Sequence, residues 1–161
     1  LRLVEAISAF DSNIHIMFCG SPTYGPYVDA IKRLAQDTGI SERVHFAGFQ
    51  DDLRPFYSAT DITTNLLDYP EGFGLSIAES MAAGKPVLAH AAGGPGEIII
   101  DDINGWLIGD VSVEAIRSGI ARALAAKSAW PEFGRNARSR IEENFSQERF
   151  MEQACDVMNL C

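Results

Sequence analysis

Two glutamates and two glycines in one short stretch have residue types and spacing suited to binding a phosphorylated sugar. Glu71 and Glu79 enclose a run that contains Gly72 and Gly74, and apolar residues at helical spacing begin after Gly74. The start of a helix leaves backbone N–H groups free and carries a partial positive charge, so it favours an anion such as phosphate. A carboxylate beside a phosphate is repelled unless it accepts hydrogen bonds from hydroxyl groups. The stretch therefore predicts a nucleotide-sugar site.

The predicted phosphate site is made mainly of backbone. The N–H groups expected to face the sugar and the phosphates belong to Gly72, Phe73, Gly74, Leu75 and Ser76. The ring of Phe73 is expected to pack rather than to react. We refer to residues 68–73 as the motif loop.

A second pair of glycines follows the next predicted strand. Gly93 and Gly94 form a tight turn beside the motif loop, which suits either close approach of a donor or a plain strand-to-helix turn. His90 ends that strand at the same edge, where it would either bond a donor phosphate or be satisfied within the core. His15 and His45 lie inside apolar strands and are interpreted as structural.

Predicted strands and helices alternate along the chain. Short apolar runs predict strands at 14–19, 44–47, 61–67, 86–90 and 106–108. Apolar spacings of three and four predict helices at 1–10, 26–38, 51–59, 74–83, 96–101, 112–126, 131–143 and 147–159. Asp51 and Asp52 are expected to cap the third helix. The order predicts an α/β fold, a three-layer αβα Rossmann-like parallel sheet whose strand-to-helix loops share one edge. The strand at 14–19 is expected to be buried on both faces.

Composition narrows the range of functions. The chain has 161 residues, 47% of them hydrophobic and 22% charged, as one ordinary globular domain would. A net charge of -9 disfavours nucleic acid and an anionic membrane as partners. The three cysteines, Cys19, Cys155 and Cys161, are odd in number and far apart, so neither a disulfide framework nor a zinc site is expected. Cysteines of this kind favour a reducing, cytoplasmic location. No apolar run reaches the roughly 20 residues that span a bilayer.

The order of the motifs resembles a known family. Glu71 and Glu79, with Gly-Phe-Gly-Leu between them, are followed by Met-Ala-Ala-Gly-Lys-Pro-Val at 81–87 and by Gly-Gly-Pro-Gly-Glu at 93–97. This ordered set is similar to the C-terminal, donor-binding half of retaining GT-B glycosyltransferases of family four. Three further segments fall in the family's order, at 44–49, 57–62 and 104–107. The resemblance therefore covers nearly the whole chain.

The resemblance implies a role for each carboxylate. Glu79 would accept hydrogen bonds from the two ribose hydroxyls of the nucleotide. The alternative interpretation is that Glu79 only complements the dipole of its helix. Glu71 would be the catalytic residue, lying near the anomeric carbon, where it stabilises oxocarbenium character or orients the donor; otherwise it is a loop acid in water. The base would lie near residues 44–50, and the sequence does not separate GDP-, UDP- and ADP-linked donors.

The implied reaction is retaining transfer of a hexosyl group from a nucleotide-diphosphate sugar to an acceptor hydroxyl. No metal or other cofactor is expected. Two other classes stay open: a sugar-nucleotide epimerase of the GT-B fold, which alters the sugar without an acceptor, and a non-catalytic αβα interaction module with a degenerate site.

The first residues indicate a piece of a longer protein. Apolar residues at helical spacing begin at Leu1 without a preceding cap, so residues 1–161 are expected to form one donor-binding domain whose first strand is missing. Relatives carry an Arg and a Lys upstream of this point that neutralise the diphosphate, so weak donor binding and no transferase activity are expected from this chain alone. The helix at 146–161 is expected to cross to an absent N-terminal domain or to mediate self-association. That absent domain would provide any peripheral contact with the cytoplasmic face of a membrane.

Overall fold

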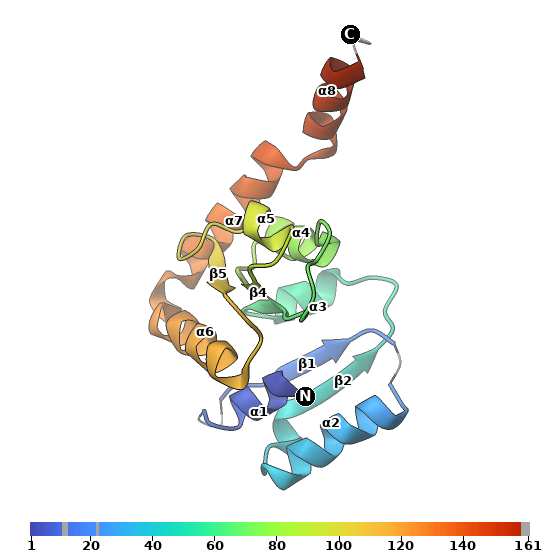
Figure 1. Ribbon diagram of the computed structural model, residues 1–161, viewed down its shortest axis with the longest axis vertical. Coiled ribbons are helices and arrows are strands. Elements are labelled where there is room, and N and C mark those ends of the chain that lie inside the picture. The colour runs from blue at the N-terminus through green and yellow to red at the C-terminus, as the bar shows by residue number, and fades with distance from the viewer. Residues whose placement is uncertain (11–12, 22, 159–161) are drawn as a thin grey trace.

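The structure is a computed structural model that describes residues 1–10, 13–21 and 23–158 (Figure 1). The last three positions of the predicted helix at 146–161, which include Cys161, lie outside the described residues.

Helices and strands alternate as the sequence predicts. In chain order they are α1 (Arg2–Ile7), β1 (Ile16–Cys19), α2 (Pro26–Asp37), β2 (Val44–Gly48), α3 (Arg54–Ala59), β3 (Thr63–Asn65), α4 (Leu75–Ala82), β4 (Val87–His90), α5 (Pro95–Ile98), β5 (Gly105–Ile108), α6 (Val113–Ala125), α7 (Trp130–Asn144) and α8 (Gln147–Met158). Two short 3-10 helices that were not predicted, Ser41–Arg43 and Lys127–Ala129, precede β2 and α7. The prediction that Asp51 and Asp52 cap α3 is wrong, because the N-cap is Leu53 and no side chain of the described residues caps this helix. Asp52, one residue earlier, accepts a hydrogen bond from the backbone N–H of Arg54 (3.0 Å).

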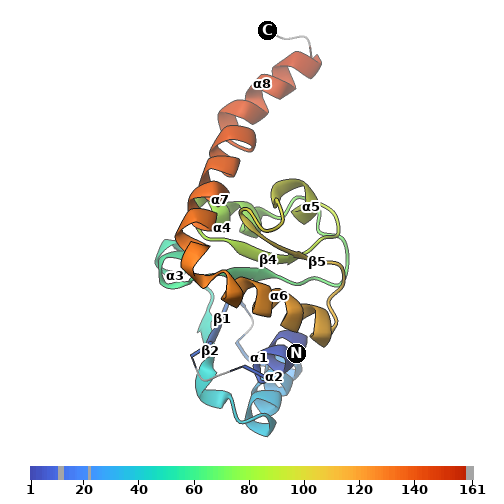
Figure 2. The same ribbon diagram turned by 90° about the vertical axis from the view of Figure 1, so that its left-hand side faces the viewer.

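All of the described strand pairs are parallel, but the strands form two sheets. β1 pairs with β2, and β4 lies between β3 and β5. The β1–β2 pair lies apart from the other three strands in both ribbon views (Figures 1 and 2). The predicted α/β class with parallel strands and flanking helices is confirmed, and within the described residues the strands divide into two sheets. An apolar run predicts that a strand pairs, but not which strand becomes its neighbour.

One face of the β1–β2 sheet is open to solvent. Ile16 of β1 is buried, whereas Met17 is 39% exposed, so the expectation that this strand is buried on both faces is wrong. His15 and His45 are also exposed, not enclosed in apolar strands. Their rings stack with centroids 5.3 Å apart, and Nδ1 of His15 lies 3.0 Å from Nε2 of His45. The two histidines thus satisfy each other on the surface.

One hydrophobic core joins the two sheets. It combines Ile16 of β1 and Ile31 of α2 with Leu88 of β4 and Trp106 of β5. Trp106 is fully buried and stacks on Phe133 with ring centroids 4.8 Å apart. This core holds the sheets together even though no strand of one pairs with a strand of the other within the described residues.

A second hydrophobic cluster fixes the position of α4. Ile77 and Met81 of α4 pack there against Val87 of β4. Helices α4 and α7 pack so closely that a Cβ atom at Gly134 would lie 2.2 Å from the carbonyl oxygen of Gly84. The helix that follows the motif loop is therefore held on two sides.

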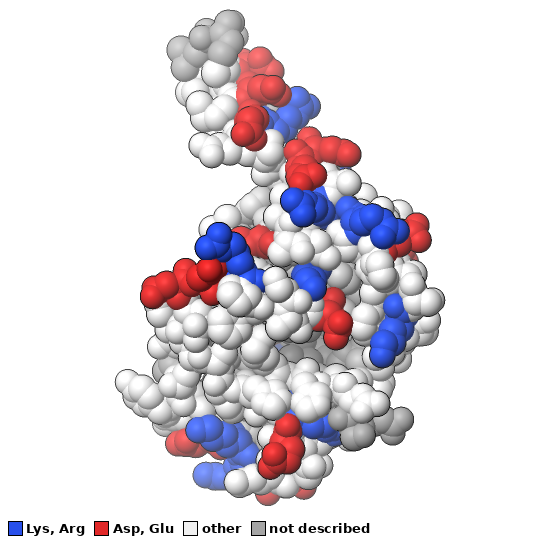
Figure 3. Space-filling model, turned by 180° about the vertical axis from the view of Figure 1, so that it is seen from behind, with Lys and Arg blue, Asp and Glu red and all other residues white. Residues whose placement is uncertain are grey.

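Helix α8 extends away from the rest of the molecule (Figures 1 and 2). Phe150, Met151 and Met158 are 67%, 54% and 57% exposed, respectively. Among the described residues, no helix has the length and apolar character needed to span a bilayer. Figure 3 shows the molecule from behind, where Lys and Arg side chains lie in separate groups beside Asp and Glu side chains.

Candidate functional site

Helix α4 begins with free backbone donors. It is preceded by Gly74, which is buried and adopts a left-handed conformation with φ 90°. The carbonyl of Gly74 accepts hydrogen bonds from the N–H groups of Ile77 (2.9 Å) and Ala78 (3.0 Å). The N–H groups of Leu75 and Ser76 have no partner within the described residues, and no side chain caps the helix. This end of α4 can therefore donate hydrogen bonds to an anion.

The motif loop is tied to the turn after β4 through the backbone. The N–H of Glu71 donates to the carbonyl of Ala92 (3.1 Å), and the N–H of Gly94 donates to the carbonyls of Glu71 (3.0 Å) and Gly72 (3.1 Å). A Cβ atom at Gly94 would lie 2.4 Å from the carbonyl oxygen of Gly72, and one at Gly93 would lie 2.1 Å from that of Glu71. The two glycines are thus required by close packing of the motif loop, a reason that the sequence did not reveal.

Both carboxylate oxygens of Glu71 accept hydrogen bonds. Oε1 accepts from the N–H of Gly72 (2.9 Å), and Oε2 accepts from Nδ2 of Asn65 (3.4 Å). Glu71 and Asn65 are half-buried, and Asn65 is the last residue of β3. Sequence reasoning missed Asn65, although a polar residue at the end of the strand before the motif loop was an available signal.

Glu79 is held by a different part of the chain. Its Oε2 accepts a hydrogen bond from the phenol of Tyr57 on α3 (3.1 Å). Burial, followed by the charge of Glu79, raises the pKa of Tyr57 to about 12, so the phenol keeps its proton. A cleft of about 490 Å³ adjoins the pair; its lining residues are Asp51, Leu53, Arg54, Tyr57, Glu79, Ala82 and Ala83. Tyr57 was not predicted, because it lies 22 positions before Glu79.

The two carboxylates do not line the same cleft. Glu71 faces Asn65 at the end of β3 and is not among the residues that line the cleft beside Glu79. That cleft also contains Arg54, a basic residue that the sequence reasoning did not place near the site, and its guanidinium pairs with Asp52 (2.8 Å).

A buried hydrogen bond and the buried apolar residues of α4 together fix the rotation of this helix about its axis. Ser80 is 0% exposed, and its hydroxyl lies 2.5 Å from the hydroxyl of Thr63 on β3. Because successive helical residues point about 100° apart, burial of Ile77, Ser80 and Met81 leaves Glu79 on the outward side of the helix. The exposed carboxylate then faces α3.

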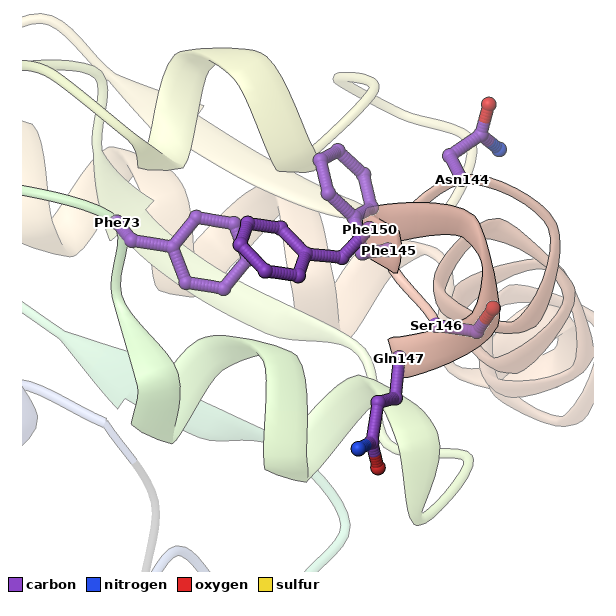
Figure 4. Close-up of a pocket in the computed structure, with 6 residues that line it drawn as sticks. All are labelled: Phe73, Asn144, Phe145, Ser146, Gln147 and Phe150. Carbon is purple, nitrogen blue, oxygen red and sulfur yellow. The ribbon is translucent and has the colours of Figure 1, made fainter. Parts of the chain in front are cut away.

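His90 and Phe73 make internal contacts. Nδ1 of the half-buried His90 lies 2.8 Å from the carbonyl oxygen of Leu67, which matches the predicted alternative of a satisfied histidine. The ring of Phe73 packs on Phe145 with centroids 5.8 Å apart. With Phe150, these rings point into a cleft of about 470 Å³ between the motif loop and the start of α8 (Figure 4).

Comparison with known sequences identifies the family. A sequence profile described as "Glycosyl transferases group 1" matches residues 1–140. The chain belongs to this family. It is 31% identical over 146 residues to the lipopolysaccharide core biosynthesis glycosyltransferase LpsE of Rhizobium meliloti, an alignment that covers 91% of this chain and 42% of LpsE. The chain therefore spans less than half the length of that relative.

Solved structures of glycosyltransferases have the same fold. Anabaena Alr3699/HepE in complex with UDP superposes with a TM-score of 0.90 at 24% identity, covering 99% of this chain and 44% of HepE. The C-terminal domain of LpcC, a glycosyl transferase group 1 family protein from Francisella tularensis, superposes with a TM-score of 0.79 at 23% identity. That match covers 91% of this chain and 78% of the LpcC domain. The expected similarity to the C-terminal half of a GT-B enzyme is confirmed at the level of the fold.

Proposed function

We propose that this domain binds a nucleotide-diphosphate sugar and that the whole protein transfers the hexosyl group to an acceptor hydroxyl with retention of configuration. The observation that carries the proposal is the uncapped start of α4, which lies between the backbone-tied loop of Glu71 and the cleft beside Glu79, in a chain of the glycosyl transferases group 1 family. Free helix donors suit the diphosphate, and the carboxylates suit hydroxyl groups on either side of it.

The proposed donor lies across the start of α4. The ribose hydroxyls donate to Glu79, and the base lies toward residues 44–50, beyond the half-buried Leu53 in the cleft wall. The free N–H groups of Leu75 and Ser76 bind the diphosphate, and the hexose lies beside Glu71. Structures of HepE with UDP and with UDP-glucose support a nucleotide-sugar ligand for this fold.

Each part of the site has a proposed role in transfer. The bond from the anomeric carbon to the diphosphate breaks while a bond to the acceptor oxygen forms on the same face, and the acceptor proton passes to the departing phosphate. Backbone N–H groups at the start of α4 stabilise the charge that grows on that phosphate, because fixed dipoles need no rearrangement. Glu71, with both oxygens already bonded, holds the hexose hydroxyls with its remaining lone pairs. The proposal includes no metal or other cofactor.

The remainder of the whole protein completes this site in the proposal. Relatives such as LpsE and HepE are more than twice as long as their matched parts, and we place the acceptor site and the basic residues for the diphosphate outside this chain. Within the described residues β1 and β3 each pair on one edge only. We infer that one further parallel strand joins these two edges into one sheet. Protection of β1 and β3 amides from hydrogen exchange should then rise in the whole protein.

We also propose that the protein is cytoplasmic and that α8 packs against a partner, either an N-terminal domain or a second copy of the chain. Cys19 and Cys155 are free thiols, as in proteins of reducing compartments. The exposed apolar residues of α8 would be covered by the N-terminal domain or by a second copy of the chain.

Titration calorimetry with UDP, GDP and ADP tests the donor site. Wild type, with the upstream segment attached, should bind one of the three more tightly than the others, and Glu79→Ala should weaken that binding by roughly tenfold or more, since a hydrogen bond to a charged group contributes about 1.5–3 kcal/mol. No binding to any of the three at millimolar concentration would favour a non-catalytic module.

Product analysis separates the enzymatic alternatives. With donor and acceptor, the whole protein should form a glycoside whose anomeric configuration, read by NMR, equals that of the donor. Release of an altered sugar from donor alone would identify an epimerase instead.

A further inference from the structure

Within the described residues, the phenol of Tyr57 is the one side-chain group that donates a hydrogen bond to the Glu79 carboxylate. The oxygen–oxygen distance is 3.1 Å, and both residues line the same cleft. Glu79 is exposed, and a free glutamate in water samples several rotamers. A hydrogen bond from the half-buried Tyr57 removes part of this freedom before any ligand arrives.

We propose that Tyr57 is a positioning residue that presents the Glu79 carboxylate to a vicinal diol of the ligand. This inference rests on the proposed function, because the diol is the ribose of the nucleotide. Tyr57 does not contact the ligand in this proposal; it acts through Glu79.

The hydrogen-bonding capacity of the pair suits a diol. An ionised carboxylate has about four lone-pair positions on its two oxygens, and Tyr57 occupies one position on Oε2. The whole of Oε1 and one position on Oε2 stay available, enough for two hydroxyl donors. Because the phenol donates, it reinforces the carboxylate as an acceptor. The high pKa of Tyr57, due first to burial, keeps the donor proton in place at neutral pH.

Two hydrogen bonds help to hold Tyr57 and Glu79 in place relative to each other. The Ser80–Thr63 hydrogen bond anchors α4 to β3, and Glu79 on the outer side of α4 meets Tyr57 of α3. The Nζ of Lys85, which follows α4, donates to the carbonyl of Ser58 (3.2 Å), the residue next to Tyr57. One bond therefore anchors α4 to β3, and the other links the chain just after α4 to α3, beside the contact.

Ribose dependence of binding is the decisive measurement. Calorimetry compares a nucleoside diphosphate with its 2′,3′-dideoxy analogue, for wild type, Tyr57→Phe and Glu79→Gln. Wild type should prefer the ribose form by about tenfold or more. In Tyr57→Phe this preference should fall about threefold to tenfold, while the affinity for the dideoxy analogue stays unchanged. In a Glu79→Gln background, Tyr57→Phe should have no further effect on the preference.

Matched controls separate positioning from loss of structure. Tyr27→Phe removes an equivalent hydroxyl from the exposed face of α2, at 64% exposure, and should leave the ribose preference unchanged. Thermal unfolding of Tyr57→Phe should match that of wild type. Wild-type ribose preference that persists in Tyr57→Phe would overturn this inference alone. Failure of wild type to bind any nucleoside diphosphate would overturn the proposed function and this inference with it.

Discussion

The surroundings of Glu71 and Glu79 are built in different ways. Glu71 lies in a loop tied by backbone hydrogen bonds to the Gly93–Gly94 turn, where the glycines leave no room for a side chain. Glu79 depends on one phenol from α3, a helix of six residues. Backbone contacts of this kind are part of the fold, whereas a single side-chain bond can change without disturbing it. We therefore expect substitution of the packed glycines around Glu71 to reduce stability and substitution of Tyr57 beside Glu79 to alter binding.

The largest effect is expected at Gly94. A Cβ atom there would lie 2.4 Å from the carbonyl oxygens of both Gly72 and Phe73. Gly94→Ala should lower the free energy of unfolding by about 3 kcal/mol or more, and the melting temperature by roughly 6–12 °C. Gly72→Ala is the matched control, because no atom lies within 4 Å of its Cβ position, and its cost should stay below about 1 kcal/mol. Equal melting temperatures of the two variants would contradict the packing argument.

The next effect concerns the buried hydrogen bond that anchors α4 to β3. Ser80→Ala leaves the half-buried hydroxyl of Thr63 without this partner, so it should lower the free energy of unfolding in urea by about 1–2 kcal/mol. Ser76→Ala, at an exposed position on the same helix, should change stability by less than about 0.5 kcal/mol. An unchanged urea midpoint for Ser80→Ala would show that the bond does not hold α4.

A smaller effect on stability is expected at Asn65. Its 3.4 Å hydrogen bond to Glu71 is long and half-buried, so Asn65→Ala should lower the free energy of unfolding by less than about 1 kcal/mol. The proposed function predicts a larger effect on catalysis. Because Asn65→Ala would leave Glu71 less well oriented, the kcat of the whole protein should fall about threefold to tenfold. Thr64→Ala, on the opposite face of β3, is the control. Equal kcat values for the two variants would exclude a role for Asn65 in orienting Glu71.

The smallest effect is a titration. Tyr57 should ionise with a pKa of about 12 when the absorbance of wild type is compared with that of Tyr57→Phe as the pH rises. Glu79→Gln should lower this pKa only in part, since burial is the larger cause. The unfolded chain loses this proton near pH 10, before the folded chain does, so the stability contributed by Tyr57 is present below pH 10 and is lost as the pH rises toward 12. Ionisation of Tyr57 in the folded chain near its ordinary pKa of 10 would contradict the observed contact.

Local signals made the motif loop and α4 predictable. The predicted helix at 74–83 corresponds to α4 (Leu75–Ala82), because Gly74 and Gly84 mark its ends with left-handed conformations. The position of the motif loop beside the Gly93–Gly94 turn also agrees with the prediction, since parallel strands bring the loops that follow them to one edge of the sheet. The roles assigned to Glu71, Glu79 and the glycines in donor binding stay predictions.

Contacts between distant segments were not predictable. Tyr57 and Glu79 are 22 positions apart and meet only in the folded chain, where the phenol on α3 reaches the carboxylate on α4. The exposure of His15 and His45 was likewise missed, because an apolar run does not show that one face of its sheet stays uncovered. The pairing of strands into two sheets depends on the same distant partners.

The sequence alone determined the order of strands and helices, the start of α4 and the set of motifs that places the chain in its family, because periodicity, glycine conformation and motif order are encoded by neighbouring residues. Only the tertiary structure decided which side chains serve each carboxylate. Asn65 reaches Glu71 and Tyr57 reaches Glu79 because packing sets the rotation and spacing of whole elements, and no local pattern contains that information.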